Sequence, residues 1–338
     1  MPKQRSPQRP VTILDVADVA GVSKSTVSLV LQGSPLIREE TAAKVRKVAK
    51  SIGYVYNKRA ADFRRQSSNV VGVVINDLMN PFFAEVLVGI ERKLVEAGFI
   101  TLMAHTNESV EMQTKVLQSM REQHAVGIIV CPAFGTPVSM VKQVQAWGMP
   151  LLVMVRSLGK GQYDYAGSDN ELGTFMATTH LLAAGHRRIG FIGGQGGPVF
   201  DERMRGYRAA MKKHRLKEDP ALICAALPTR QGGYTALQRL LEASPRATAA
   251  VCYNDVAAFG ALAALGERGI TAGRDFAIMG FDGVLDTAHS NPPLSTIDIH
   301  PGTLGESAAS LLLERLKNPN GDPKRHISAP ELLLRKSA

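Results

Sequence analysis

The chain has 338 residues, of which 45% are hydrophobic, and a formal net charge of +10 at pH 7. This length predicts two or three folded units, and the apolar content is ample for a large core. The basic, Pro-rich start has no apolar segment behind it and no run approaches the length of a membrane span, which excludes a secretion signal and a transmembrane helix and predicts a cytoplasmic protein.

A helix-turn-helix is predicted between Thr12 and Leu31. Thr12 and Asp15 are typical of an N-terminal cap, Gly21 can take the positive φ of a sharp helix exit, and Ser23 is a good N-cap for a second helix. Apolar residues at helical spacing form three stripes: Ile13, Val16, Ala17 and Ala20; Val27, Val30 and Leu31; Ala42, Val45, Ala49 and Ile52. Three short helices can therefore share one core, with an ordinary helical hairpin as the alternative.

Positive charge is concentrated in the same part of the chain. Residues 1–65 contain 13 Lys or Arg against 5 Asp or Glu, a net of +8, whereas the remaining residues contain 27 against 25, a net of +2. Clustered lysines and arginines are the electrostatic footprint of a protein that binds a nucleic-acid backbone. The charge therefore favours a DNA-binding head over an ordinary hairpin, and residues 1–11 are interpreted as a disordered basic tail.

From residue 69 onward, short apolar runs alternate with stretches of helical periodicity. The first set of expected strands covers residues 70–75, 101–104, 128–131 and 151–155, with helices at 83–97, 111–123 and 138–147. The second set covers strands at 189–192, 222–225, 249–253 and 277–281, with helices near 172–184, 203–213, 233–242 and 256–268. This alternation predicts parallel sheets covered by helices on both faces, so the expected fold class is α/β with two doubly wound lobes.

The loops after the strands are where a binding site is expected, because ligands of open α/β sheets bind beyond the carboxyl ends of the strands. Asn80 can form hydrogen bonds there, and Phe82 can offer a flat surface to a sugar or a nucleobase, although it can also pack into the core. The other candidates in these loops are Phe134, Arg156, Asp169, Asn254, Asp255 and Asp282. Arginines and carboxylates suit a ligand with several hydroxyls, whereas for Asp169 and Asp282 the capping of a helix or loop is equally open.

No catalytic site is predicted. The eight histidines have no metal-ligand spacing, and no nucleophile has an adjacent base. The glycines between positions 193 and 197 lack both the GK[ST] and the GxGxxG patterns. Cys131, Cys224 and Cys252 are widely spaced and set among apolar or small residues, which favours buried thiols. We therefore expect no catalytic residues, no cofactor and no metal ion.

Several motifs follow one another along almost the whole chain: TILDVADVAGVSKSTVSLVLQG, EETAAKVRKVAKSIGYVYN, VVGVVINDLMNPFFAEVLVGIE, HLLAAGHRRIGFIGG, ERMRGYRAAM, VCYNDVAAFGA, GFDG and LSTIDI. Together they resemble the LacI family of bacterial transcription regulators. The resemblance implies a helix-turn-helix head at residues 12–56, a hinge at 57–68 and, at 69–338, an effector-binding and dimerisation domain of the periplasmic-binding-protein type. The first lobe is expected at about residues 69–166 and 297–320 and the second at about 167–296 and 321–338. The resemblance also implies that Arg203, in ERMRGY, grips the effector.

The same resemblance implies how the head and hinge meet DNA. One helix of the head is expected in the major groove, and the candidate contacts around it are Thr12, Ser23, Lys24, Ser25, Thr26, Ser28 and Leu29. Leu29 stands where many relatives have a polar residue, and we expect it to favour a thymine methyl. In the hinge, the candidate minor-groove contacts are Asn57, Ala60, Phe63 and Arg64, with Phe63 in place of the usual leucine wedge.

These features predict a transcriptional regulator, most simply a repressor, that binds a near-palindromic operator as a homodimer and responds to a small effector. A sugar or sugar derivative is favoured, with a nucleobase or a sugar acid as alternatives, and the sequence separates neither an inducer from a corepressor nor a repressor from an activator. A solute-binding protein without a regulatory role is disfavoured, because it predicts a secretion signal and no DNA-binding head. The chain has no leucine heptad tail, so a dimer is favoured over a tetramer.

Overall fold

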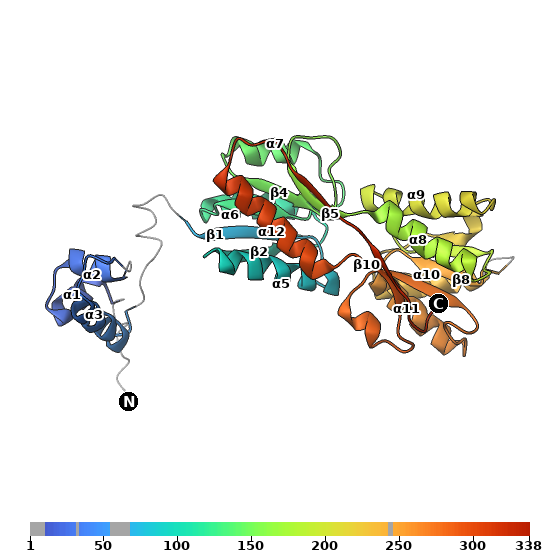
Figure 1. Cartoon of the computed structure of the whole chain (residues 1–338), viewed down its shortest axis with the longest axis horizontal. Helices are drawn as coiled ribbons and strands as arrows, with labels where there is room; N and C mark the ends of the chain where they lie inside the picture. The colour runs from blue at the N-terminus through green and yellow to red at the C-terminus, as the bar shows by residue number, and fades with distance from the viewer. Residues whose placement is uncertain (1–10, 32–33, 55–67, 243–245) are drawn as a thin grey trace, which may run out of the picture. The chain divides into compact units, whose positions relative to one another are not determined.

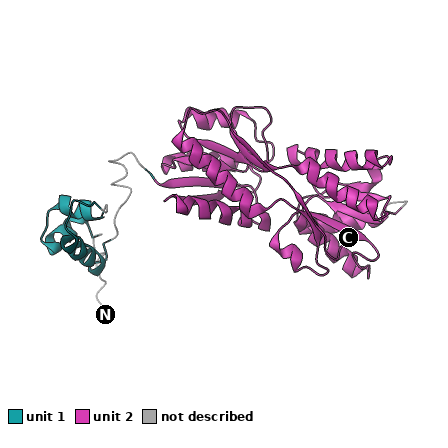
Figure 2. Cartoon of the chain, in the orientation of Figure 1, with its two compact units in different colours: residues 1–68 teal, residues 69–338 magenta. Residues whose placement is uncertain are grey.

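The computed structural model describes residues 11–31, 34–54, 68–242 and 246–338. They fall in two compact units, Met1–Ser68 and Asn69–Ala338, which Figure 2 colours separately. The division comes at the end of the polar segment that the sequence suggests as a hinge.

Unit 1 has three helices among its described residues, α1 (Ile13–Ala20), α2 (Lys24–Leu31) and α3 (Glu39–Ser51). Thr12 donates from its backbone N–H and its hydroxyl to Asp15 Oδ2, at 2.7 Å in each case, and Gly21 ends α1 with a φ of 66°. The predicted cap and exit are confirmed. The predicted stripes form one buried core: Val16, Ala17, Ala20, Val27, Val30, Ala42, Val45 and Ala49.

The first sheet of unit 2 is parallel and has the order β11-β5-β4-β3-β1-β2. Figure 1 labels its strands β1, β2, β4 and β5. Its strands are β1 (Val70–Ile75), β2 (Ile100–His105), β3 (Gly127–Val130), β4 (Leu151–Met154), β5 (Asp164–Ser168) and β11 (Arg325–Ser328). Its helices are α5 (Pro81–Glu96), α6 (Val110–Glu122), α7 (Ser139–Ala146) and α12 (Pro301–Lys317). Alternate residues of β1 enter two core clusters: Val73 packs with α5 and α12, whereas Val74 packs with α6 and α7. The sheet is therefore covered on both faces, as predicted.

A second sheet has the order β12-β10-β9-β8-β6-β7, with β12 antiparallel to β10. Its strands are β6 (Ile189–Ile192), β7 (Ile223–Cys224), β8 (Ala249–Cys252), β9 (Ala277–Asp282), β10 (Ser295–Asp298) and β12 (Glu331–Leu333). Helices α8 (Asn170–Ala183), α9 (Pro198–Lys213), α10 (Arg230–Glu242) and α11 (Asp255–Glu267) accompany them, with short 3-10 helices η1 (Pro220–Leu222) and η2 (Leu285–Ala288). Gly280 and Phe281 are neighbours on β9 and therefore face opposite sides of the sheet. Phe281 lies against Gly173 of α8, whereas Gly280 lies against Asp255 of α11, so helices cover both faces. The predicted α/β class with two doubly wound lobes is confirmed.

The chain passes between the sheets after β5, after β10 and after β11. The expected lobe boundaries near residues 166 and 297 fall inside β5 and β10, so both boundaries lie slightly further along the chain. The assignment of all of 321–338 to the second lobe is wrong, because β11 pairs in parallel with β5 of the first sheet. The sequence RHIS carries little apolar signal, and Asp164 holds the segment instead: it accepts the Lys324 N–H at 2.7 Å and two Arg315 N–H groups at 2.8 and 2.9 Å.

No helix of the described residues is long and apolar enough to span a membrane. Within the same residues, His, Cys, Asp and Glu side chains form no group that could hold a metal ion. Cys131, Cys224 and Cys252 are free and buried, as predicted.

Candidate nucleic-acid interface and effector site

The exposed face of α2 carries the candidate DNA contacts. Val27 and Val30 turn inward, while Lys24 and Ser25 are exposed and Leu29 is half-buried. Ser25 and Leu29 are one helical turn apart and share a face, because four residues advance the helix by about 400°. The buried Val27 and Val30 lie on the opposite face. The pair therefore forms the centre of a short outward face, which the predicted major-groove contact requires.

Capping bonds already engage several of the hydroxyls near α2. Ser23 Oγ accepts the Thr26 N–H at 3.1 Å and lies 2.9 Å from Thr26 Oγ1, which confirms Ser23 as the N-cap. Thr12 uses its hydroxyl to cap α1. DNA contacts from Thr12, Ser23 and Thr26 remain predictions, and each would share a hydroxyl that also holds a helix end. Asn57, Ala60, Phe63 and Arg64 lie outside the described residues.

In the first lobe of unit 2, Arg156 and Glu108 form a two-pronged ion pair. Arg156 follows β4 and Glu108 follows β2, and their N–O distances are 2.9 and 3.0 Å. Glu108 also accepts the Asn76 Nδ2 amide and the Phe134 backbone N–H, each at 2.6 Å. Burial raises the pKa of the Glu108 carboxyl, but the bonds from Arg156, Asn76 and Phe134 together outweigh it, so the pKa lies below its usual value. Glu108 is therefore ionised at neutral pH and offsets the charge of Arg156.

In the second lobe, Arg203 of α9 is buried, and each nitrogen of its guanidinium donates a hydrogen bond to the protein. Its Nη2 donates to Asp282 Oδ1 at 3.1 Å and its Nε to Asn170 Oδ1 at 3.0 Å, while Nη1 donates to the Tyr253 carbonyl. The guanidinium also lies 3.7 Å from the centre of the Phe281 ring. Burial raises the pKa of Asp282 to about 6, although Arg203 and Asn80 both favour the carboxylate. The second lobe thus presents a second arginine–carboxylate pair.

Three contacts connect the two lobes near these pairs. Asn80, which caps α5 by accepting the Phe82 N–H at 3.1 Å, also hydrogen bonds Asp282. Glu85 of α5 accepts the Leu285 N–H of η2 at 2.9 Å. Phe134 lies so close to Gly197 that a side chain on Gly197 would be 2.7 Å from the ring. Asn80, Phe134, Arg156, Arg203 and Asp282 are therefore brought together, as the sequence predicts for one site between strand ends.

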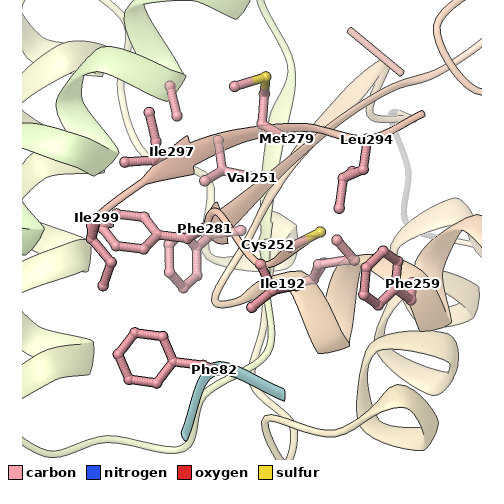
Figure 3. Close-up of a cluster of buried hydrophobic side chains, with 14 of the residues drawn as sticks. Phe82, Ile192, Val251, Cys252, Phe259, Met279, Phe281, Leu294, Ile297 and Ile299 are labelled. Carbon is pink, nitrogen blue, oxygen red and sulfur yellow. The ribbon is translucent and has the colours of Figure 1, made fainter. Parts of the chain in front are cut away.

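Phe82 is placed differently from the predicted ligand platform. It is 2% exposed, meets Phe83 edge-on at 5.1 Å and lies in the apolar cluster with Phe281 and Ile299 (Figure 3). Neither ring face is open to a ligand in this arrangement. Phe134, which is 50% exposed, presents an aromatic surface instead.

Three polar candidates have structural roles, and ligand contacts from Asn254 and Asp169 remain predictions. Asp255 is 0% exposed, and its carboxylate accepts the Gly283 and Val284 N–H groups at 2.8 and 3.0 Å and the Thr296 hydroxyl at 2.6 Å. Asp255 therefore holds the loop that carries Asp282. The other two cap helices: Asn254 Oδ1 accepts the Ala257 N–H at 2.9 Å, and Asp169 Oδ1 accepts the Leu172 N–H at 2.9 Å.

Glu108, Asn76 and Tyr253 are site residues that sequence reasoning missed. Asn76 and Tyr253 each follow a strand directly, so the rule about strand ends could have found them. Glu108 lies in the loop after β2, so the same rule covers its loop without singling it out. In that loop Asn107 and Glu108 both have positive φ, 49° and 58°. Both ion pairs act on the pKa of Tyr253: burial raises this pKa, Arg203 and Arg156 lower it, and Asp282 and Glu108 raise it.

Comparisons with known proteins agree with both units. Residues 12–57 match the pattern of bacterial regulatory proteins of the lacI family, and residues 178–338 match a periplasmic binding protein-like domain. The chain is 31% identical over 330 residues to a ribose operon repressor of Haemophilus influenzae, and the match covers 96% of this chain and 98% of the relative.

Solved structures agree as well. A complex of the transcriptional regulator CelR with cellobiose has a TM-score of 0.74 and 27% identity, over 97% of this chain and 100% of that one. A LacI-family regulator of Enterococcus faecium with bound ribose has a TM-score of 0.74 and 26% identity, over 80% of this chain and 98% of that one.

Proposed function

Since this chain belongs to the lacI family of bacterial regulatory proteins, we propose that a sugar bound between the lobes of unit 2 sets its affinity for operator DNA. The chain is a DNA-binding transcriptional repressor controlled by an effector. Ribose and cellobiose in the two structural neighbours support a sugar for this chain too. Because a regulator binds its operator on the chromosome, we place the protein in the cytoplasm. We assign it no catalytic activity, because the relative it matches over its whole length is a transcriptional repressor.

Operator binding is proposed to follow the geometry of α2. Two copies of the chain form a dimer, and each places the face with Ser25 and Leu29 in the major groove of one half of a near-palindromic site. Of the three exposed candidates, Ser23 caps α2, so Lys24 and Ser25 are the first residues proposed to reach base edges or phosphates. The segment with Phe63 is proposed to enter the minor groove between the half-sites.

The observation that carries the effector proposal is the chain of contacts from Asn80 through Asp282 to Arg203. It crosses from one lobe to the other beyond the strand ends, where α/β proteins bind ligands. A sugar has vicinal hydroxyls that can both donate and accept, so it can exchange hydrogen bonds with an amide, a carboxylate and a guanidinium together. Binding there would favour one arrangement of the lobes. The change in operator affinity is limited by the difference between the sugar's affinities for the two arrangements.

The test combines an effector screen with a substitution at Arg203. A thermal-shift panel of pentoses, hexoses, disaccharides, nucleobases and sugar acids should identify a ligand, because a molecule that binds only the folded chain raises Tm. Operator affinity, measured by fluorescence anisotropy, should change when that ligand is added. Arg203→Ala should abolish the change while operator affinity without ligand stays within about threefold, a shift of less than 1 kcal/mol.

Arg205→Ala is the matched control, because Arg205 is on the same helix and pairs with Glu171 at the surface. It should keep the response. A full response in Arg203→Ala would show that the site lies elsewhere, and a nucleobase as the sole ligand would replace the sugar with the alternative effector.

A further inference from the structure

We propose that Glu108 makes the effector site select an uncharged sugar over sugar acids and sugar phosphates, because it cancels the positive charge that an anionic effector would need. This inference rests on the proposed function, in which the effector binds between the lobes. It adds a specificity-determining residue, in the loop after β2, that was not among the sequence-based candidates.

The first argument is the charge balance of the site. Two arginines face the region around Tyr253, one from each lobe, and each is paired: Arg156 with Glu108 at 2.9 Å and Arg203 with Asp282 at 3.1 Å. An anionic group of an effector is normally bound by an unpaired arginine fork or a cluster of cations. Here an added anion would compete for each guanidinium with a carboxylate that is already at short range: Asp282, which is buried, and Glu108, whose side chain is 38% exposed.

The second argument is the polarity of the hydrogen bonds that remain. Glu108 already accepts four hydrogen bonds, two on each oxygen. Asp282 has acceptor capacity left, and Asn76 Oδ1 is a buried acceptor to which no described residue donates. Acceptors require donors, and a sugar hydroxyl can donate, whereas an ionised carboxylate or phosphate oxygen only accepts. Both the charges and the donor–acceptor pattern therefore favour a neutral polyol.

The third argument is that the chain holds Glu108 in place at a conformational cost. Asn107 and Glu108 adopt consecutive left-handed backbone conformations, which are unfavourable for a residue such as Glu. The Glu108 N–H donates to the Asn76 carbonyl at 3.2 Å, and its carboxylate is bound by Arg156, Asn76 and the Phe134 N–H. These bonds fix the carboxylate against Arg156, so it is a permanent part of the site wall.

The experiment compares the full-length chain with Glu108→Gln, which preserves shape and an acceptor but frees the Arg156 charge. Isothermal titration measures Kd for neutral aldoses, the matching aldonates and the matching sugar phosphates, beginning with D-ribose, D-ribonate and D-ribose 5-phosphate. The wild type should bind the neutral sugar at least tenfold more tightly than either anion. In Glu108→Gln the ratio of the Kd for the anion to the Kd for the neutral sugar should fall at least tenfold, mainly because the aldonate or phosphate binds more tightly.

Two further variants separate charge from structure. Glu111→Gln changes an exposed carboxylate three positions away that pairs with Lys115, and its preference should equal the wild type. Glu108→Gln combined with Arg156→Met removes both charges, so the preference for the neutral sugar should return. Operator affinity and Tm show that each variant is folded.

Tighter binding of an anionic sugar by the wild type would overturn the inference and leave the sugar site intact. Equal weakening of neutral and anionic ligands by Glu108→Gln would also overturn it, since Glu108 would then be structural. If no sugar of any charge bound or changed operator affinity, the proposed function itself would fall, and the inference with it.

Discussion

Replacement of Arg203 by Met is expected to destabilise unit 2 to an extent that grows with pH. The Arg203 and Asp282 side chains are 5% and 6% exposed, so each depends on the other for charge compensation. Met retains apolar length over the Phe281 ring but removes the cation. Asp282 would remain buried without a counter-charge and would respond by binding a proton, because an isolated buried carboxylate is strongly disfavoured.

The size of the effect follows from the pKa of Asp282, which burial raises from 3.8 to about 6 even beside Arg203. In the wild type, the free energy of unfolding falls as pH rises through this interval and is then constant, since above it the folded and unfolded states bind equal numbers of protons at this group. Without Arg203 the pKa rises further, so stability continues to fall. A one-proton difference gives a slope of about 1.4 kcal/mol per pH unit, or roughly 2 kcal/mol between about pH 6 and about pH 7.5.

A pH-independent loss should accompany this slope. Asn170 Oδ1 and the Tyr253 carbonyl would each lose the donor that Arg203 provides, at a cost of about 1–3 kcal/mol for each acceptor left unsatisfied. The variant should therefore already be less stable than the wild type at acidic pH, and the difference should widen toward neutrality.

Urea denaturation followed by far-UV circular dichroism, at about pH 5.5 and about pH 7.5, measures both parts of the effect. Arg205→Met is the matched control, since Arg205 and Glu171 are 54% and 49% exposed and such a pair contributes less than about 1 kcal/mol. An equal loss of stability at the two pH values in Arg203→Met would refute the reasoning, because it would mean that Asp282 does not take up the proton.

Three other substitutions test the head and the second lobe. Leu29→Arg should change the preferred base at one position of each operator half-site in a binding-site selection experiment, and an unchanged preference would place Leu29 away from the groove. Ser23→Ala should destabilise the head by about 1 kcal/mol in thermal denaturation through loss of the α2 cap, whereas Ser25→Ala, which removes an exposed side chain, should change it by less than half as much. Asp255→Leu should cost about 1–3 kcal/mol for each lost bond in urea denaturation, because the Gly283 and Val284 N–H groups would lose the carboxylate oxygen that accepts both of them. Wild-type stability in that last variant would contradict the loop-holding role.

The head could be predicted in detail because its determinants are local. Thr12 and Asp15 are three residues apart, as are Ser23 and Thr26, and both caps form as expected. Gly21 ends α1 in the left-handed conformation that glycine adopts at little cost. Helix ends and apolar stripes depend on residues within one or two turns, so a single sequence contains most of the information.

The strands of unit 2 were predictable where they are continuous apolar runs, as in β1 and β9, because buried parallel strands have that composition. β11 was not, since its sequence RHIS is mostly polar and its position depends on Arg315 and Asp164, which are 151 residues apart. The swap of the C-terminal segment from one sheet to the other is therefore a property of long-range pairing.

The sequence by itself determined which loops carry the candidate effector site, because polar residues that follow buried strands must gather at one edge of a sheet. The tertiary structure alone decided what each of them does. In the folded chain Asp255 supports a loop and Phe82 is buried. Glu108 pairs with Arg156, 48 positions away, and Asp282 pairs with Arg203, 79 positions away. Whether a carboxylate binds a ligand, caps a helix or cancels an arginine depends on its neighbours in space, and those are fixed only when the two sheets have formed.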